Sequence, residues 1–215
     1  MAWPDLLVLV RHAESQGNTL NRDERAKLAV PTFGYPLTEK GRWQAAETGK
    51  YLNERFGTFD VYYNSYYERT KETMRIMYPH AKVYEDPRLA EAQRGIYHTM
   101  SLNEIAERFP EEIARKDREG LYHYRPWGGE NWPDIELRIH SFMGTLARDY
   151  GGKRVLITVH GHWLILFQRL VEHFSIEEAL RRYDEEIVAN ASVTIYKGGN
   201  RLVLQEYVVP WKEAA

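Results

Sequence analysis

The sequence of 215 residues contains no cysteine. Disulfide bonds, thiolate nucleophiles and thiolate metal ligands are therefore excluded, while the redox compartment stays undecided. The N-terminal region also lacks a basic segment, and its apolar run from Leu6 to Val10 is far shorter than a signal peptide or a membrane span. We therefore expect a soluble, cytoplasmic protein that does not interact with membranes.

The chain has no excess of charge of one sign, because 29 basic residues meet 31 acidic ones and leave a net charge of −2. No global field then exists to attract nucleic acid, which we do not expect as a partner. Internal repeats and low-complexity tracts are absent as well. With 43% apolar and 28% charged residues, the composition is that of one globular domain.

Apolar runs of strand length alternate with segments of helical periodicity. Leu6–Val10 and Arg154–Val159 are continuous apolar runs, typical of strands that are covered on both faces. Further strands are expected at 60–63, 81–84, 192–196 and 202–209, and helices at 38–56, 67–77, 101–109, 110–119, 134–150, 163–174 and 176–183. This alternation predicts an α/β fold, in which ligands bind at the carboxyl ends of parallel strands.

A charged side chain and an imidazole, Arg11 and His12, follow directly after the first strand. The small residues Ala13, Ser15 and Gly17 come next and allow a turn whose backbone amides face an anion. The pattern favours a phosphate pocket. Taken alone, it fits equally well a strand that simply ends at solvent.

Two further segments place polar groups at the same expected edge of the sheet. Arg69 lies at the start of a helix that follows a strand, where helix amides and a guanidinium bind one anion together. His160 ends the strand Arg154–Val159 in a position equivalent to that of His12. The three segments together predict an anion site.

The chain carries a set of short motifs in a fixed order. They are Arg11-His12-Ala13-Glu14-Ser15 with Asn18, Pro36-Leu37-Thr38-Glu39-Lys40-Gly41 with Gln44-Ala45, Ser65 with Arg69-Thr70 and Thr73, Leu89-Ala90-Glu91 with Gly95, Gly128-Gly129-Glu130, Asp134 with Arg138, and His160-Gly161. With these motifs in this order, the chain resembles the histidine phosphatase superfamily, which includes the cofactor-dependent phosphoglycerate mutases. The resemblance implies a phosphoglycerate mutase-like fold: a three-layer α/β/α sandwich with a mostly parallel central sheet and a helical cap. We expect one domain over residues 1–215, with the cap inserted at about 92–127.

The resemblance also implies roles for the residues that match. His12 is expected to attack phosphorus and become phosphohistidine, while Arg11, Arg69 and His160 hold the non-bridging oxygens. Glu91 is the expected general acid, although an ordinary surface carboxylate is the alternative. The expected substrate-binding residues are Asn18, Ser15, Gly161, His162 and Arg94.

Positioning and fixed positive charge suffice for such a transfer, so no cofactor and no metal ion are expected. The spacing of His160 and His162 suggests a metal site, but the sequence offers no cysteine and no evident carboxylate as a further ligand. His80, His98, His140 and His173 are expected to be surface or packing residues. Ala13, Asn131 and Ile165 depart from the family pattern, which leaves the substrate open.

Water accepts the phosphoryl group in a phosphatase, and a second hydroxyl accepts it in a mutase. Residues 19–35 lack the Phe-Thr-Gly-Trp-like stretch that phosphoglycerate mutases carry, and the chain stops soon after Val209, so we expect a phosphatase. A phosphoglycerate mutase and a non-catalytic phospho-ligand-binding module are the alternatives.

The expected partner is a small phosphorylated metabolite or a phosphoprotein. A homodimer is expected only by analogy. The aromatic cluster from Tyr122 to Trp127 is interpreted as packing between cap and body, with stacking on a substrate as the alternative.

Overall fold

The computed structural model describes residues 2–185 and 188–213. The strands are β1 (Leu6–Arg11), β2 (Val61–Asn64), β3 (Val83–Glu85), β4 (Arg154–Val159), β5 (Val193–Lys197) and β6 (Val203–Val208). The α-helices are α1 (Gln16–Thr19), α2 (Arg22–Ala26), α3 (Glu39–Phe56), α4 (Glu68–Met77), α5 (Leu102–Arg108), α6 (Pro110–His123), α7 (Trp132–Asp149), α8 (Gly161–Glu172), α9 (Ile176–Asp184) and α10 (Pro210–Glu213). Short 3-10 helices are η1 (Thr32–Gly34), η2 (Pro87–Leu89) and η3 (Gly95–His98).

One six-stranded sheet forms the centre of the molecule, with the strand order β3-β2-β4-β1-β5-β6. The pairs β2 with β3, β2 with β4 and β1 with β4 are parallel, whereas β5 pairs antiparallel with both β1 and β6. The carboxyl ends of β1, β2 and β4 therefore meet at one edge, where the sequence placed Arg11, Arg69 and His160.

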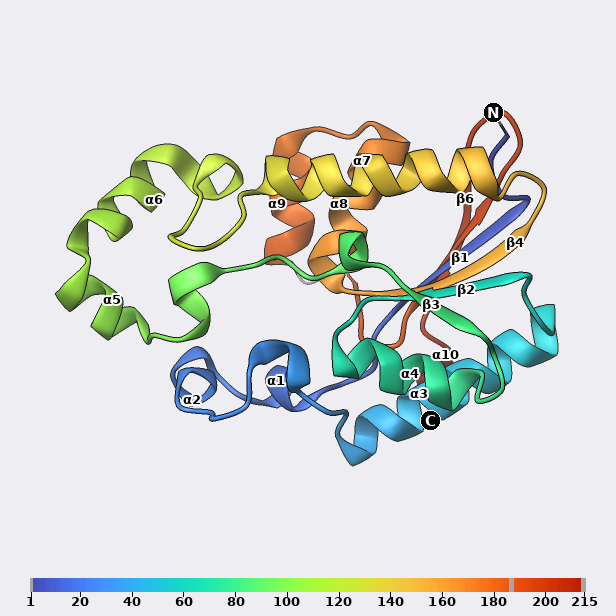
Figure 1. The fold of residues 1–215 in the computed structure, drawn as a ribbon, viewed down its shortest axis with the longest axis horizontal. Helices are drawn as coiled ribbons and strands as arrows, with labels where there is room; N and C mark the ends of the chain where they lie inside the picture. Colours follow the sequence, from blue (N-terminus) through green and yellow to red (C-terminus); the bar gives the residue numbers. More distant parts are fainter. Residues whose placement is uncertain (1, 186–187, 214–215) are drawn as a thin grey trace.

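Helices cover both faces of this sheet because successive strand residues point to opposite sides. Leu7 and Leu9 pack in one cluster with residues of α7 and α8, while Val8 and Val10 pack in another with residues of α3 and α4. Figure 1 shows α7, α8 and α9 on one side of the sheet and α3 and α4 on the other. The predicted fold class, a three-layer α/β/α sandwich with a mostly parallel sheet, is confirmed.

The region expected to form the cap contains η3, α5 and α6 (Figure 1), which extend beyond the end of the sheet. Gly120, with φ of 72°, kinks the chain near the end of α6. The aromatic side chains that follow are used for packing, since Tyr122 and Tyr124 are buried, whereas Trp127 is 47% exposed. The interpretation as packing between cap and body is confirmed for Tyr122, which contacts Trp132 and Glu136 of α7. Tyr124 instead packs within the cap, where its hydroxyl donates to Glu112. The assignment of one domain with an insertion at 92–127 stays a prediction.

The structure contains elements that the periodicity did not predict. Helices α1 and α2 lie in a segment without a regular apolar pattern, and α10 lies in what the sequence indicated only as a short tail. Helix α8 begins at Gly161, two residues before the expected start, with His160 as its N-cap residue. This earlier start places His162 in the first turn of α8, whose N-terminus lies at the carboxyl edge of the sheet.

The loop after β1 is held by the N-terminus of α3. Thr38, the predicted cap residue, accepts a hydrogen bond from the backbone of Gly41, and its own backbone N–H donates to the carbonyl of Glu14. At Gly41 the backbones approach so closely that a Cβ atom would lie 1.9 Å from the Glu14 carbonyl oxygen. A residue without a side chain is therefore required for α3 to support this loop.

We expect Gly41→Ala to lower the free energy of unfolding by about 1–3 kcal/mol, because the added methyl group forces α3 and the loop apart. Gly144→Ala is the matched control: this helical glycine of α7 has no atom within 4 Å of an added Cβ. It should raise stability by about 0.5–1 kcal/mol. Urea unfolding of both variants checks this, and equal effects would contradict the close contact.

Candidate active site

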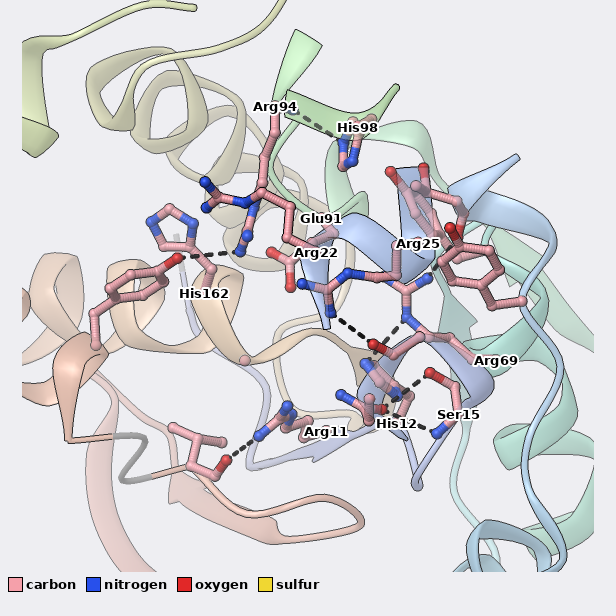
Figure 2. Close-up of a pocket in the computed structure, with 18 of the residues that line it drawn as sticks. Arg11, His12, Ser15, Arg22, Arg25, Arg69, Glu91, Arg94, His98 and His162 are labelled. Carbon is pink, nitrogen blue, oxygen red and sulfur yellow. Dashed lines mark hydrogen bonds between the residues drawn. The ribbon is translucent and has the colours of Figure 1, made fainter. Parts of the chain in front are cut away.

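A cavity of about 450 Å³ opens at the carboxyl edge of the sheet. Its walls come from β1 and the loop after it, from α2 and α4, from the segment around Glu91, and from the start of α8 and the end of α9. Of the residues expected in the site, the following line this cavity: Arg11, His12, Ser15, Asn18, Arg69, Glu91, Arg94, Gly161 and His162. Figure 2 shows how the side chains that it labels converge from separate elements.

The hydrogen bonds of His12 assign its tautomer. Nδ1 lies 2.8 Å from the carbonyl oxygen of Ala13, an acceptor, so Nδ1 carries the proton and donates it. The other ring nitrogen, Nε2, lies 3.1 Å from Nε of Arg69, which can only donate. Nε2 therefore carries the lone pair and is the nucleophilic atom of this imidazole.

His12 is held in its neutral, reactive form. Burial lowers the pKa of His12 well below 6.5, and the charges of Arg69 and Arg11 lower it further. At neutral pH the lone pair on Nε2 is consequently available without a separate general base.

Arg69 connects the two histidines of the site. It is only 8% exposed, and its Nη2 lies 3.1 Å from Nδ1 of His160 while its Nε faces His12. Its Nη1 donates to the carbonyl oxygen of Thr32 at 2.9 Å, and the ring of Tyr67 lies 4.4 Å from its guanidinium carbon. Burial lowers the pKa of Arg69 to about 10, so it stays protonated at neutral pH.

His160 lies behind the cavity wall and is fully buried. Because its Nδ1 accepts from Arg69, its Nε2 carries the proton and donates to Oγ of Ser65 at 3.0 Å. Burial and the charge of Arg69 lower the pKa of His160 well below 6.5. In this arrangement His160 orients Arg69, and its expected contact with phosphate oxygens stays a prediction.

Arg11 enters the cavity floor from the end of β1. Its Nη1 donates to the carbonyl oxygen of Val188. A Cβ atom at Gly161 would lie 3.2 Å from Nε of Arg11, so the glycine leaves room for the guanidinium. Arg11 and Arg69 thus bring two guanidinium groups to the side of His12 where a phosphoryl group would lie.

The loop after His12 is stabilised internally by Ser15 and Asn18. The backbone N–H and the hydroxyl of Ser15 each lie 2.9 Å from Oδ1 of Asn18. Asn190, which the sequence did not single out, donates from Nδ2 to the carbonyl oxygen of His12 at 3.0 Å. These amides fix the turn that presents the imidazole.

Glu91 lines the cavity, as expected of a general acid. Its Oε1 accepts a hydrogen bond from the N–H of Ala92 at 3.0 Å, which orients the carboxyl group. Glu91 and Arg69 line the same cavity, and the charge of Glu91 raises the pKa of Arg69 against the effect of burial. The role of Glu91 as the general acid stays a prediction.

Several lining residues were not identified from the sequence. Arg22 and Arg25 reach the cavity from α2, and Tyr183 and Asp184 reach it from α9. The signal that could have revealed α2 is its capping box, in which Asn21 and Glu24 cap each other's backbone N–H groups. His98, expected at the surface or in packing, also lines the cavity and accepts a hydrogen bond from the backbone of Arg94.

Over residues 2–185 and 188–213, no group of three or more His, Asp or Glu side chains is placed to hold a metal ion. The ring nitrogens of His160 contact Arg69 and Ser65, so this residue does not join His162 in a metal site. In the same part of the chain, no helix has the length and apolar character needed to cross a membrane.

Comparison with known proteins identifies the family. The family model of the histidine phosphatase superfamily (branch 1) matches residues 7–206. Because this match covers nearly all of the chain, the protein belongs to the histidine phosphatase superfamily, whose members are phosphatases and mutases.

Similar proteins with known names include both activities. A 2,3-bisphosphoglycerate-dependent phosphoglycerate mutase of Parvibaculum lavamentivorans is 30% identical over 184 residues, which are 82% of this chain and 84% of that protein. Phosphoserine phosphatase 1 of Hydrogenobacter thermophilus is 29% identical over 157 residues, covering 72% and 70% of the two chains. A phosphoglycerate mutase-like protein of Arabidopsis thaliana is 32% identical over 162 residues, 68% of this chain but 54% of that protein, so the chain spans about half its length.

Among solved structures, YhfR of Bacillus stearothermophilus is similar over 93% of this chain and 94% of its own, with a TM-score of 0.74 and 26% identity. The fold is thus retained at low sequence identity.

The neutral histidines of the site make stability dependent on pH. Burial lowers the pKa of His162 well below 6.5, so the unfolded chain binds a proton below about pH 6.5 that the folded chain does not bind. The stability is fully present above pH 6.5 and is lost as the pH falls. For one such histidine the loss between pH 7.5 and 5.5 is about 1.4 kcal/mol.

Between pH 7.5 and 5.5, we expect the free energy of unfolding of His162→Phe to fall by about 1.4 kcal/mol less than that of the wild type. The ring fits between Trp132 and Tyr183, and no hydrogen bond is removed because neither ring nitrogen of His162 has a partner. Urea unfolding at both pH values measures the difference. An unchanged pH dependence would mean that His162 is not buried in its neutral form.

Proposed function

We propose that this protein is a phosphatase that hydrolyses phosphate monoesters through phosphohistidine at Nε2 of His12. The observation that carries the proposal is the state of this nitrogen: it is unprotonated, faces a cavity and lies against the guanidinium of Arg69. A nucleophile without a proton beside fixed positive charge is the arrangement that phosphoryl transfer requires.

The residues supply each step of this reaction. Nε2 attacks phosphorus while the ester P–O bond breaks, and the leaving oxygen takes the electron pair and a proton from Glu91. Water then attacks the phosphohistidine as the P–N bond breaks and its electron pair returns to His12. Glu91, now a carboxylate, takes the proton of that water, which restores both groups and releases inorganic phosphate.

Arg11 and Arg69 stabilise the charge on the non-bridging oxygens in both steps. The proposal assigns no role to a metal ion or a cofactor, since positioned cations already fulfil the electrostatic requirement. It includes the cytoplasmic location and the phosphorylated-metabolite substrate that we expect from the sequence.

A phosphoglycerate mutase is the second candidate, favoured by the named mutase relative at 30% identity. The segment from 19 to 35 supports the phosphatase instead: it lacks the Phe-Thr-Gly-Trp-like stretch and forms α2 and η1. The two activities differ in what reaches the phosphohistidine first: water in a phosphatase, and a second substrate hydroxyl in a mutase.

We expect the wild type to hydrolyse p-nitrophenyl phosphate in the presence of EDTA, and His12→Ala to lose at least about 1,000-fold in kcat, because the covalent intermediate cannot form. His80→Ala, an exposed histidine outside the cavity, is the matched control and should retain wild-type activity. Colorimetric assays measure both. An inert wild type, or a fully active His12→Ala, would overturn the proposal and bring the mutase or the binding module forward.

The role of Glu91 predicts a dependence on the leaving group. Glu91→Gln should lower kcat/KM by about 100-fold or more with an alkyl phosphate, whose alkoxide needs a proton, and much less with p-nitrophenyl phosphate. Asp184→Asn changes a second carboxylate that lines the cavity and should show no such dependence. Equal losses of Glu91→Gln with both substrates would remove Glu91 from the proton transfer.

A further inference from the structure

Three of the arginines that line the cavity have no role in the proposed phosphoryl transfer. Arg22 and Arg25 enter from α2, and Arg94 enters from the segment that follows Glu91. Figure 2 shows Arg94 at one end of the cavity and Arg11 and His12 at the other. The cavity is therefore positively charged along its length, well beyond the space that one phosphoryl group occupies.

These three arginines have only neutral partners. Arg25 donates from Nη1 to the carbonyl oxygen of Gly17 at 2.7 Å, and Arg94 donates from Nη2 to the hydroxyl of Tyr183 at 3.1 Å. The guanidinium carbon of Arg22 lies 5.4 Å from the centre of the Tyr97 ring. Within the described residues none of the three forms a salt bridge, although Glu91 and Asp184 line the same cavity.

The arginines are close enough to repel one another. Burial lowers the pKa of Arg25, and the charges of Arg94 and Arg22 lower it further. Like charges that are partly removed from water destabilise a fold unless an anion joins them. Within the described residues, Glu91 and Asp184 line this cavity but form no salt bridge with any of the three arginines, so an anionic group of a ligand has donors here to bind.

His162 provides an independent observation at the same place. It is 6% exposed and lines the cavity, and neither of its ring nitrogens has a hydrogen-bond partner. Its ring is held between Trp132 and Tyr183, with centroid distances of 4.5 and 4.9 Å. Buried polar groups in native proteins are normally hydrogen-bonded, so a vacant donor and acceptor on a fixed ring indicate a bound polar group.

We propose that Arg22, Arg25, Arg94 and His162 form a subsite for a second anionic group, so that the substrate is a phosphomonoester whose leaving group carries a carboxylate or another phosphate. This inference rests on the proposed function, because it places the transferred phosphoryl group at His12. The second anion lies toward Arg94, and a polar group of the leaving group reaches His162. Glu91 lies between the two charged ends, next to the bond that breaks.

The test compares pairs of substrates that differ only in the second charge. The first pair is 3-phosphoglycerate and glycerol 1-phosphate, in which a carboxylate is replaced by a hydroxymethyl group. The second pair is fructose 1,6-bisphosphate and fructose 6-phosphate, in which a phosphate is replaced by a hydroxyl. We expect kcat/KM for phosphate release to be about 10- to 100-fold higher for the charged member of at least one pair, as charge-assisted hydrogen bonds predict.

The pair that shows the preference identifies whether the second group is a carboxylate or a phosphate. If the wild type hydrolyses p-nitrophenyl phosphate but prefers neither charged member, the subsite is refuted while the phosphatase proposal stands. If the wild type does not hydrolyse p-nitrophenyl phosphate, the proposed function itself has failed. The two failures are thus distinguishable.

Substitutions assign the preference to the arginines. Arg94→Gln and, in a separate protein, Arg22→Gln should each reduce the ratio of charged to neutral kcat/KM at least tenfold, mainly through KM of the charged substrate. Arg118→Gln is the control, because this arginine of α6 is 70% exposed and does not line the cavity. It should leave the ratio unchanged.

A purely structural role of Arg94, through its contact with Tyr183, would lower kcat/KM for both members of a pair alike and keep the ratio constant. That result in both arginine variants would overturn the inference. Because Arg22 belongs to a different element, its variant provides the same test if Arg94→Gln fails to fold.

Discussion

The buried guanidinium of Arg69, held between two neutral imidazoles, is the interaction on which the rest of the site depends. Its donors can meet His12 and His160 only if each ring offers a lone pair, and so they fix both tautomers. The backbone carbonyl of Ala13 and the hydroxyl of Ser65 then accept hydrogen bonds from the protonated ring nitrogens of His12 and His160. Burying a cation is costly, and this cost is offset by the hydrogen bonds and by the Tyr67 ring beside it.

In the proposed mechanism, this arrangement makes a separate base unnecessary. In many hydrolases a third residue removes the proton of the nucleophile, whereas here burial and two guanidinium groups keep His12 unprotonated. In the proposed reaction the same positive charges also stabilise the phosphoryl group during transfer. Activation of the nucleophile and stabilisation of the transition state thus come from one set of side chains, at the expense of stability in acid.

The scaffold serves this site by bringing the ends of several strands to one edge. The parallel pairing of β1 with β4 and of β4 with β2 places the residues after each strand side by side. The close approach of Gly41 to Glu14 supports the loop after β1 from the helix layer that contains α3. Two segments outside the sheet, α2 and the end of α9, close the remaining walls and bring the charges that distinguish this cavity.

The central strands, the layers and the reactive pair Arg11 and His12 were predictable because each depends on local sequence: an apolar run of strand length, a helical periodicity or a motif of adjacent residues. Arg69 and His160 were predictable in the same way, since they lie where a helix begins and where a strand ends, while Glu91 was predicted only from a family motif. Arg22 and Arg25 were not predicted, because α2 has no apolar face and the tertiary structure alone brings it over the cavity. The sequence by itself determined which groups the proposed chemistry uses. Only the tertiary structure decided their protonation states and the surrounding charge, since both depend on burial and on contacts between segments distant in the chain.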